Sequence, residues 1–489
     1  MKTPLFLFIV ALFVRLAVVA IWQFDGLYGQ DAFAYFQQAV AITERLPQGR
    51  LPPTDFFWPN GFPLLAALVM LALGKSVLAA QFVNLLCGAA LAPLVYGLSR
   101  ELFPARGYTV GIVSGLVIAI AGQPILSSVV IMADMLALFW ATLAAWLLVC
   151  AWRKPGQRWW LLGAGAALSL AVITRWIYVL LIPAFAAYTL YQMHRHRSPW
   201  WYVLLPVLIG ASVILPQLWL SRNRPEGLLH SWLLGWSPGN AFRRQFDNID
   251  GHFVYRLPVG IFYAEPAGHP AYLFPLLGLT VPWGIWRLWQ ERNWGPLILL
   301  LGWGGPVYLF LAGIPYQNFR FGLTLYLPLV LLAGFGLSDL RNCPPLQKIA
   351  QAAVVFSLLG MLTWAYPMLN RFLTKATESK EIACRVAQAV PPEATLLTFG
   401  LTLTVRHYTS VHTRELFYFD ASSLDALTVS QAPLYLLLDV SNADSQWRGR
   451  PPEVNYRWLK DHTILTQIRD FPPYTLFLVQ RATGSGRER

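Results

Sequence analysis

Residues 4–22 read PLFLFIVALFVRLAVVAIW, an apolar run in which Arg15 is the only charged residue. A helix needs about 20 apolar residues to cross the hydrocarbon core of a bilayer, so this run predicts a membrane span. It ends in the bulky residues IWQF without a small-residue cleavage site, which favours a retained first span over a removable signal peptide. Arg15 lies near the middle, where a lone charge costs about 2.5–3.5 kcal/mol on insertion scales. We therefore expect its side chain to face protein or to reach the interface.

Apolar runs of this kind recur along the chain. Its 489 residues are 56% hydrophobic and 12% charged, more apolar surface than one water-soluble core can bury. The runs are about 15–22 residues long, which is typical of membrane helices rather than of barrel strands. We predict an α-helical polytopic membrane protein with about 11 transmembrane helices. The predicted spans are residues 4–22, 77–98, 108–122, 134–151, 159–174, 177–193, 201–220, 271–288, 295–312, 322–338 and 349–367.

The net charge of +13 arises mainly from basic residues beside the predicted helix ends. That distribution indicates contact with lipid headgroups and argues against a nucleic-acid partner. With the N-terminus inside, the short internal segments contain Lys2, Arg100, Arg106, Arg153, Lys154, Arg158, Arg195, Arg197, Arg287, Arg292, Arg341 and Lys348. The first loop and the short external turns contain Arg45, Arg50, Lys75, Arg175 and Arg320. This asymmetry predicts a multi-pass protein of the plasma (inner) membrane with a cytoplasmic N-terminus and an external C-terminal domain.

Three larger regions then lie outside: residues 23–76, residues 221–270 and everything after residue 368. In the first of them, residues 61–74 are apolar but too short for a span, which predicts an interfacial or re-entrant helix. Residues 31–46 have the pattern of an amphipathic helix with Asp31 at its start, a favourable position for a carboxylate.

The C-terminal region alternates helix and strand patterns and predicts a small external α/β domain over residues 369–482, after a transmembrane catalytic domain over 1–368. Residues 483–489 predict a disordered tail. The expected elements are helices near 374–390 and 422–430, strands at 394–399, 415–419 and 434–440, and a strand pair ILTQIR and YTLFLVQ separated by DFPP.

Several local patterns follow one another in a recognisable order. Asp31 precedes Tyr35 by four residues just after the first span, and WPNGFPLLAAL occupies residues 58–68. Further along come SSVVIMADMLALFW (127–140), WLSRN (219–223) and RFGLTLYLPLVLLAGFGL (320–337). In this order the sequence resembles the C-type (GT-C) polytopic glycosyltransferases that use prenyl-phosphate sugars, in the branch of the protein mannosyltransferases and the lipid A aminoarabinose transferase.

The resemblance implies an inverting transfer from a prenyl-phosphate-linked sugar to an external protein, lipid or glycan, with Asp31 as the catalytic base and Tyr35 near the substrate. A prenyl-phosphate leaves as a stable anion, so one general base for the acceptor is enough and no second acid is needed. Many members have two adjacent acids here, whereas Asp31 is flanked by Gln30 and Ala32. Asp55 in the same loop is the rival for the base, and the alternative role of Asp31 is a helix cap.

Three external arginines are candidate phosphate ligands, because a guanidinium remains charged and can bind two oxygens. Arg320 is the best candidate, and Arg175 and Arg222 lie at other external span ends; each could instead anchor the membrane edge. Asp134 could help to position the acceptor or could interact with a helix N-terminus. Similar proteins often carry an arginine in the first span, which suggests a structural partner for Arg15.

Other functional classes remain to be distinguished. A transporter or lipid flippase is the main alternative, although the sequence contains no internal repeat of the kind that many transporters have. A non-catalytic scaffold that recruits a partner through its external domain is a third. We predict no cofactor, because the lipid-phosphate sugar is a substrate; a divalent metal stays open, as do the sugar, the acceptor and the prenyl chain length.

Overall fold

The computed structural model describes residues 2–153, 156, 158–223, 231–342, 344–430 and 432–481. The chain forms two compact units, and each is described by itself. The first unit comprises Met1–Gly26, Tyr35–Arg243 and Leu257–Phe372, and the second comprises Leu27–Ala34, Arg244–Arg256 and Leu373–Arg489. The predicted tail at 483–489 lies outside the described residues. The predicted domain boundary at residue 368 falls inside one long helix and stays a prediction.

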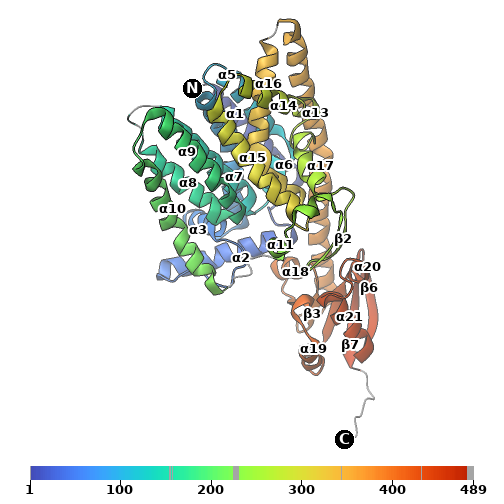
Figure 1. Ribbon diagram of the computed structural model, residues 1–489. Coiled ribbons are helices and arrows are strands. Elements are labelled where there is room, and N and C mark those ends of the chain that lie inside the picture. Colours follow the sequence, from blue (N-terminus) through green and yellow to red (C-terminus); the bar gives the residue numbers. More distant parts are fainter. Residues whose placement is uncertain are drawn as a thin grey trace. The chain divides into compact units, whose positions relative to one another are not determined.

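The first unit is helical (Figure 1). Its helices in chain order are α1 (Lys2–Trp22), α2 (Gly29–Arg45, which begins in the second unit), α3 (Gly61–Leu73), α4 (Val77–Leu102), α5 (Gly107–Ile120), α6 (Gly122–Val129), α7 (Ala133–Arg153), α8 (Trp160–Thr174), η2 (Trp176–Leu181), α9 (Ile182–His196), α10 (Trp201–Leu220), η3 (Ser221–Asn223), α11 (Ser231–Leu234), α12 (Val259–Ala264), α13 (Pro275–Gly278), α14 (Thr280–Gln290), α15 (Trp294–Gly313), η7 (Phe319–Leu325), α16 (Tyr326–Arg341) and α17 (Gln347–Ala389, which continues into the second unit).

Among the described residues, 8 helices are long and apolar enough to cross a membrane, or up to 9 if α5 and α6 form one bent span. The polytopic helical fold is therefore confirmed, whereas the count of eleven is not. Two predicted spans fall short: α8 has 15 residues, and residues 271–288 divide into α13 and α14, which has 11. The predicted juxtamembrane segment at 61–74 is the 13-residue helix α3, and the predicted amphipathic helix at 31–46 is α2.

Arg15 explains how the bend between α5 and α6 is stabilised. The two helices meet at 57°, so the last carbonyls of α5 lose their usual helical donors. Arg15 is fully buried and donates from Nη1 to the Ala119 carbonyl at 3.3 Å and from Nη2 to the Ile118 carbonyl at 3.3 Å. Its Nε donates to Ser128 Oγ at 2.9 Å. The charge in the first span thus faces protein, as expected, and caps a broken helix.

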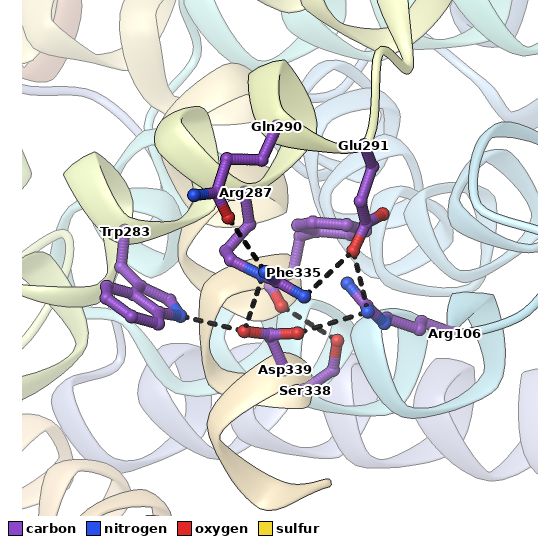
Figure 2. Close-up of polar contacts among 8 residues, drawn as sticks. All are labelled: Arg106, Trp283, Arg287, Gln290, Glu291, Phe335, Ser338 and Asp339. Carbon is purple, nitrogen blue, oxygen red and sulfur yellow. Dashed lines mark hydrogen bonds and ion pairs between the residues drawn. The ribbon is translucent and has the colours of Figure 1, made fainter. Parts of the chain in front are cut away.

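A second charged group joins the ends of α5, α14 and α16 (Figure 2). Asp339, whose side chain is 7% exposed, lies 3.0 Å from Arg106 Nη2 and 2.9 Å from Arg287 Nε, and accepts a hydrogen bond from Trp283 Nε1 at 3.0 Å. Glu291 lies 2.8 Å from Arg106 and 3.4 Å from Arg287. Two arginines of the predicted internal segments are therefore balanced by two carboxylates, so they also hold helices together.

The second unit contains a five-stranded sheet in the order β4-β3-β5-β7-β6. Strands β4, β3 and β5 are parallel, whereas β7 pairs antiparallel with β5 and β6. Its elements after α17 are β3 (Thr395–Thr398), α18 (Thr402–Tyr408), β4 (His412–Glu415), η9 (Leu416–Tyr418), α19 (Ala421–Thr428), β5 (Leu434–Leu438), α20 (Val440–Ser445), α21 (Pro451–His462), β6 (Thr463–Phe471) and β7 (Tyr474–Arg481).

Alternation along the central strands gives this sheet two buried faces. Leu396 packs with Val386 of α17 in one apolar cluster, and its neighbour Leu397 packs with Leu424 of α19 and Leu459 of α21 in another. Because successive strand residues point to opposite faces, one run of leucines supplies both cores. The unit is the small α/β domain that the sequence predicted (Figure 1).

One predicted strand is wrong in position. Residues 415–419 were expected to be extended, but β4 ends at Glu415 and Leu416–Tyr418 form a 3-10 turn. Asn455 of α21 donates from Nδ2 to the Leu416 and Phe419 carbonyls, each at 2.8 Å. A buried side-chain amide therefore satisfies backbone groups that a neighbouring strand would otherwise pair with.

The predicted external loop 221–270 contributes a hairpin to the second unit. Strands β1 (Gln245–Asn248) and β2 (Gly251–Val254) pair antiparallel, and His252 N donates to the Gln446 carbonyl at 2.7 Å. A Cβ on Gly251 would lie 2.5 Å from that carbonyl oxygen, so the contact requires glycine. Segments from all three predicted external regions thus form one compact unit. Because one unit cannot fold on both sides of a bilayer, the three segments share one side.

Candidate active site

Asp31 lies in the first turn of α2, as the sequence predicted, and belongs to the second unit. Gly29, with φ of 72°, turns the chain into the helix, a backbone conformation that glycine adopts at little cost. The next two residues, Ala32 and Phe33, are buried, whereas Asp31 is half-buried. A half-buried carboxylate in a helix's first turn is stabilised by the helix dipole and remains reachable from solvent.

Tyr35 lies one turn further along α2, in the first unit, and is 5% exposed. Its ring stacks on Trp58 at 5.3 Å between centroids and meets Phe56 and Phe62 edge-on at 5.4 and 5.7 Å. Asp55 stands exposed immediately before this aromatic cluster. The first loop therefore brings Tyr35 against the WPNGF stretch, a pairing that the sequence analysis did not anticipate.

Asp134 and Arg175 form an ion pair. Asp134 lies in the first turn of α7 with a side chain 4% exposed, and Arg175 lies between α8 and η2 with a side chain 20% exposed. The structure thus joins two residues that the sequence identified separately. A buried carboxylate requires such a partner, because an unpaired charge away from water is costly.

Arg320 approaches the same part of the first unit as Arg175. The two guanidinium carbons lie 5.7 and 4.8 Å from the centre of the Phe321 ring, and that ring is buried. Arg320 Nη1 also lies 3.0 Å from Met132 Sδ. Met132 precedes α7, and its carbonyl accepts a 2.7 Å hydrogen bond from the buried Asn84 Nδ2. We refer to Arg175 and Arg320 around Phe321 as the arginine pair.

The arginine pair carries two positive charges, and Asp134 forms an ion pair with Arg175. Such a group can bind an anion, since guanidinium and phosphate oxygens form charge-assisted hydrogen bonds. The sequence suggested the arginines through their positions at external span ends. Phe321 and Met132 were missed as members of the group, because an apolar side chain in an apolar run gives no separate signal.

Arg222 has a different environment. It lies in η3, is exposed, and stands 4.6 Å from the centre of the Trp219 ring. Trp219 is itself 48% exposed. An exposed tryptophan with an arginine beside it is typical of a membrane interface, so this environment matches the anchoring alternative.

Metal ligands do not gather in the described part of the chain, where no three His, Cys, Asp or Glu side chains are placed to hold an ion.

The family model of dolichyl-phosphate-mannose-protein mannosyltransferases matches residues 59–219. This segment includes Asp134 and Arg175 and excludes Asp31 and Arg320. No curated protein sequence matches the chain significantly.

Solved structures match nearly the whole chain. ArnT from Cupriavidus metallidurans bound to undecaprenyl phosphate is 14% identical with a TM-score of 0.65, covering 96% of this chain and 97% of that one. AglB, the oligosaccharyltransferase of Archaeoglobus fulgidus, in complex with an inhibitory peptide and a dolichol-phosphate, is 12% identical with a TM-score of 0.61 over 90% and 70% of the two chains. An Archaeoglobus fulgidus oligosaccharyltransferase tethered with an acceptor peptide is 13% identical with a TM-score of 0.57 over 90% of this chain and 69% of that one.

The chain therefore has the fold of ArnT and of the archaeal oligosaccharyltransferase AglB, the kind of fold that the sequence resemblance predicted. The chain is thus similar to ArnT in fold over 96% of its length and to the family of dolichyl-phosphate-mannose-protein mannosyltransferases in sequence over residues 59–219.

Proposed function

We propose that this protein is a membrane glycosyltransferase that transfers a hexosyl or pentosyl group from a prenyl-phosphate-linked donor to an external acceptor, with inversion at the anomeric carbon. The acceptor is a protein, a lipid or a glycan. The observation that carries the proposal is the arginine pair, a site for an anion within a GT-C fold. Two proteins of similar fold were solved with undecaprenyl phosphate and dolichol-phosphate, the leaving groups of such donors.

In the proposed reaction the arginine pair binds the donor phosphate and stabilises the negative charge that develops as the sugar–phosphate bond breaks. Asp31 accepts the proton of the acceptor O–H or N–H while that atom attacks the anomeric carbon from the face opposite the phosphate. The prenyl-phosphate leaves as an anion. Since it needs no proton, one carboxylate is sufficient.

We further propose the inner membrane as the location, with the N-terminus in the cytoplasm. The charge distribution along the sequence supports this orientation. Residues 1–368 then form the catalytic membrane domain, and residues 369–482 form an external domain. Tyr35 and Asp134 are proposed to help position the acceptor, the former through its aromatic surroundings and the latter through Arg175.

Replacement of the two rival carboxylates tests the base. In purified protein, Asp31→Asn is expected to lower the transfer rate by about 10²–10⁴-fold, the usual contribution of a general base. Asp55→Asn, in the same loop, is expected to keep most activity because that side chain is exposed and outside the helix start. Transfer is followed by mass spectrometry of cell-envelope glycans and glycolipids after incubation with each purified variant, and an unchanged melting temperature shows that each variant is folded.

The opposite pattern, with Asp55→Asn inactive and Asp31→Asn active, would assign the role of general base to Asp55. Movement of a lipid-linked sugar across liposomes without any covalent product would replace the transferase with the transporter alternative. Full function with both Asp31 and Arg320 neutralised would favour the scaffold.

A further inference from the structure

The parallel part of the sheet in the second unit has an edge at which α/β folds commonly bind ligands. Strand β3 lies between β4 and β5 and is parallel to both. After β3 the chain forms β4 on one side of it and then β5 on the other side, so the strand order reverses at β3. Ligands of open α/β sheets bind outside the carboxyl ends of the strands at such a reversal. The loop that follows β3 at this edge, Phe399–Leu401, contains Gly400 with a left-handed φ of 83°.

The chain itself contacts this loop through Gln30. The side-chain amide of Gln30 donates from Nε2 to the Gly400 carbonyl at 2.5 Å and accepts at Oε1 from Leu403 N at 3.1 Å. Leu403 is the second residue of α18, where backbone N–H groups have no partner within the helix. Both ends of one amide are therefore used, one on each side of the turn from β3 into α18.

Phe33 makes a second contact with the same helix. It is 1% exposed, and its ring lies 5.5 Å from the His407 ring and 5.9 Å edge-on from the Tyr408 ring, both in α18. Residues three apart share one face of a helix. Gln30 and Phe33 therefore fix both the position and the rotation of the first turn of α2, and Asp31 lies between them in that turn.

We infer that Gln30 is a positioning residue: through Gly400 and Leu403, the C-terminal α/β domain holds the turn that carries Asp31. The ligand-binding edge of this domain is thus used to hold a segment of the chain's own first loop. This inference rests on the proposed role of Asp31 as the base. It gives the external domain a direct part in the reaction, because a base misplaced by 1 Å loses about 10²-fold in rate.

The Gln30 amide both donates a hydrogen bond to Gly400 and accepts one from Leu403 N, and two substitutions distinguish these contacts. Gln30→Met keeps the length of the side chain and removes the donor and the acceptor. Gln30→Glu keeps an acceptor for Leu403 N but places a carboxylate oxygen against the Gly400 carbonyl oxygen. Gln37→Met makes the same change at a half-buried position of the same helix that has no such contact among the described residues, and serves as the matched control.

We expect Gln30→Met and Gln30→Glu to lower kcat by about 10–100-fold while the KM for the lipid-linked donor stays within about twofold, since the donor site is unchanged. Gln37→Met should behave like the wild type. In the Asp31→Asn background, Gln30→Met should lower the rate no further, because a residue that acts through Asp31 has nothing left to position. A further 10–100-fold loss in that background would overturn the inference.

Hydrogen exchange tests the contact without reference to activity. Gln30→Met should speed the exchange of backbone amides in residues 27–34 and 400–408. Exchange in the other segments and the melting temperature of the protein should stay unchanged. Unchanged exchange in these segments would overturn the docking. If Asp31→Asn retains full transfer, the assignment of the base fails, yet the exchange result still decides whether Gln30 holds the start of α2.

Discussion

Arg175 and Arg320 approach the same phenylalanine ring, but their partners differ. Arg175 is paired with the buried carboxylate of Asp134, whereas the sulfur of Met132 lies beside Arg320. Within the arginine pair, we propose Arg320 as the ligand of the donor phosphate to test first, because the sequence places it at an external span end.

Arg320→Met should lower kcat/KM for the donor by about 10–100-fold, the loss of one hydrogen bond to a charged group. Arg320→Lys should lose less, since it keeps the charge but not the two-pronged geometry. Arg50→Met removes an exposed arginine of the first loop and is the control, with an expected change within about twofold. Equal values for Arg320→Met and Arg50→Met in steady-state assays would contradict the assignment.

Glu415 ends β4 opposite Thr398, and burial raises the pKa of its carboxyl above the ordinary value of 4.5. The folded state therefore binds a proton more tightly than the unfolded state. Stability supplied by the neutral carboxyl is present below about pH 4 and is lost as the pH rises through the raised pKa.

Glu415→Gln mimics the neutral carboxyl and should remove this loss. The melting temperature of the variant minus that of the wild type should rise between pH 4 and pH 7 and be positive at pH 7. Asp425→Asn, an exposed change in the same domain, is the control for the loss of one negative charge. A constant difference for Glu415→Gln would refute the effect of burial.

Much of the candidate site is visible in the sequence because charges stand out in apolar runs. Asp134, Arg175 and Arg320 were identified in that way, at the ends of predicted spans, whereas Asp31 was identified through the family resemblance. What the sequence did not provide was their partners: the pairing of Asp134 with Arg175 and the contacts of Gln30 join residues from distant segments. Such long-range contacts follow from the packing of helices, which a local pattern does not specify.

At the scale of elements, helix ends are held together by charges as well as by apolar packing. Asp339 of α16 binds Arg106 at the start of α5 and Arg287 of α14 (Figure 2). Glu291 completes the group but is more exposed, 32% against 7% for Asp339. The deeper carboxylate should therefore contribute more, because solvent screens it less.

Asp339→Asn should lower the free energy of unfolding by about 3 kcal/mol, since it leaves two arginines short of a buried partner. Glu291→Gln, the control within the same group, should cost about 1 kcal/mol or less. Thermal unfolding in detergent measures both. An equal cost for the two changes would show that burial does not set the strength of these pairs.

The sequence predicted helices and strands correctly where a single hydrophobic pattern extended over the whole element. The long apolar helices and strands β3, β5 and β7 occur at the predicted residues because a continuous apolar run fits a buried helix or a central strand. Helices α18, α20 and α21 were missed, and the first two are only 7 and 6 residues long. The predicted span at 349–367 and the helix at 374–390 are one helix of 43 residues, α17. Their apolar and polar halves appeared to be two elements.

At the scale of the whole molecule, the second unit constrains the number of crossings. Its three segments share one side, so the chain must cross an even number of times between residues 26 and 244 and again between 256 and 373. The described helices supply 5 long spans in the first interval, counting α5 and α6 as one, and 3 in the second. Each interval needs one more crossing. The first interval contains two shorter apolar helices, α3 and α8, and the second contains the α13–α14 pair. If α8 and the α13–α14 pair both cross, α1 brings the total to the eleven crossings that the sequence predicts.

Cysteine labelling tests this topology in a variant whose own cysteines are replaced. Single cysteines at Gly268 and Arg50 should react with an impermeant maleimide in intact cells. Single cysteines at Arg153, His194 and Gln290 should react only after the membrane is permeabilised. If only one of the cysteines at positions 153 and 194 requires permeabilisation for labelling, α8 does not cross the membrane. Labelling of Gln290 from outside would exclude the α13–α14 pair.

The partners of Arg15 also set an order of events during synthesis. The carbonyls that receive its guanidinium, those of Ile118 and Ala119, lie 103 and 104 residues further along the chain. The first span is therefore made and inserted before these two carbonyls exist, and only a carbonyl of its own helix, that of Ala11, is then available to the guanidinium. Helix α1 can reach its final packing only after the bent α5–α6 segment has been synthesised. The helix made first in the chain is thus among those whose final packing depends on later ones.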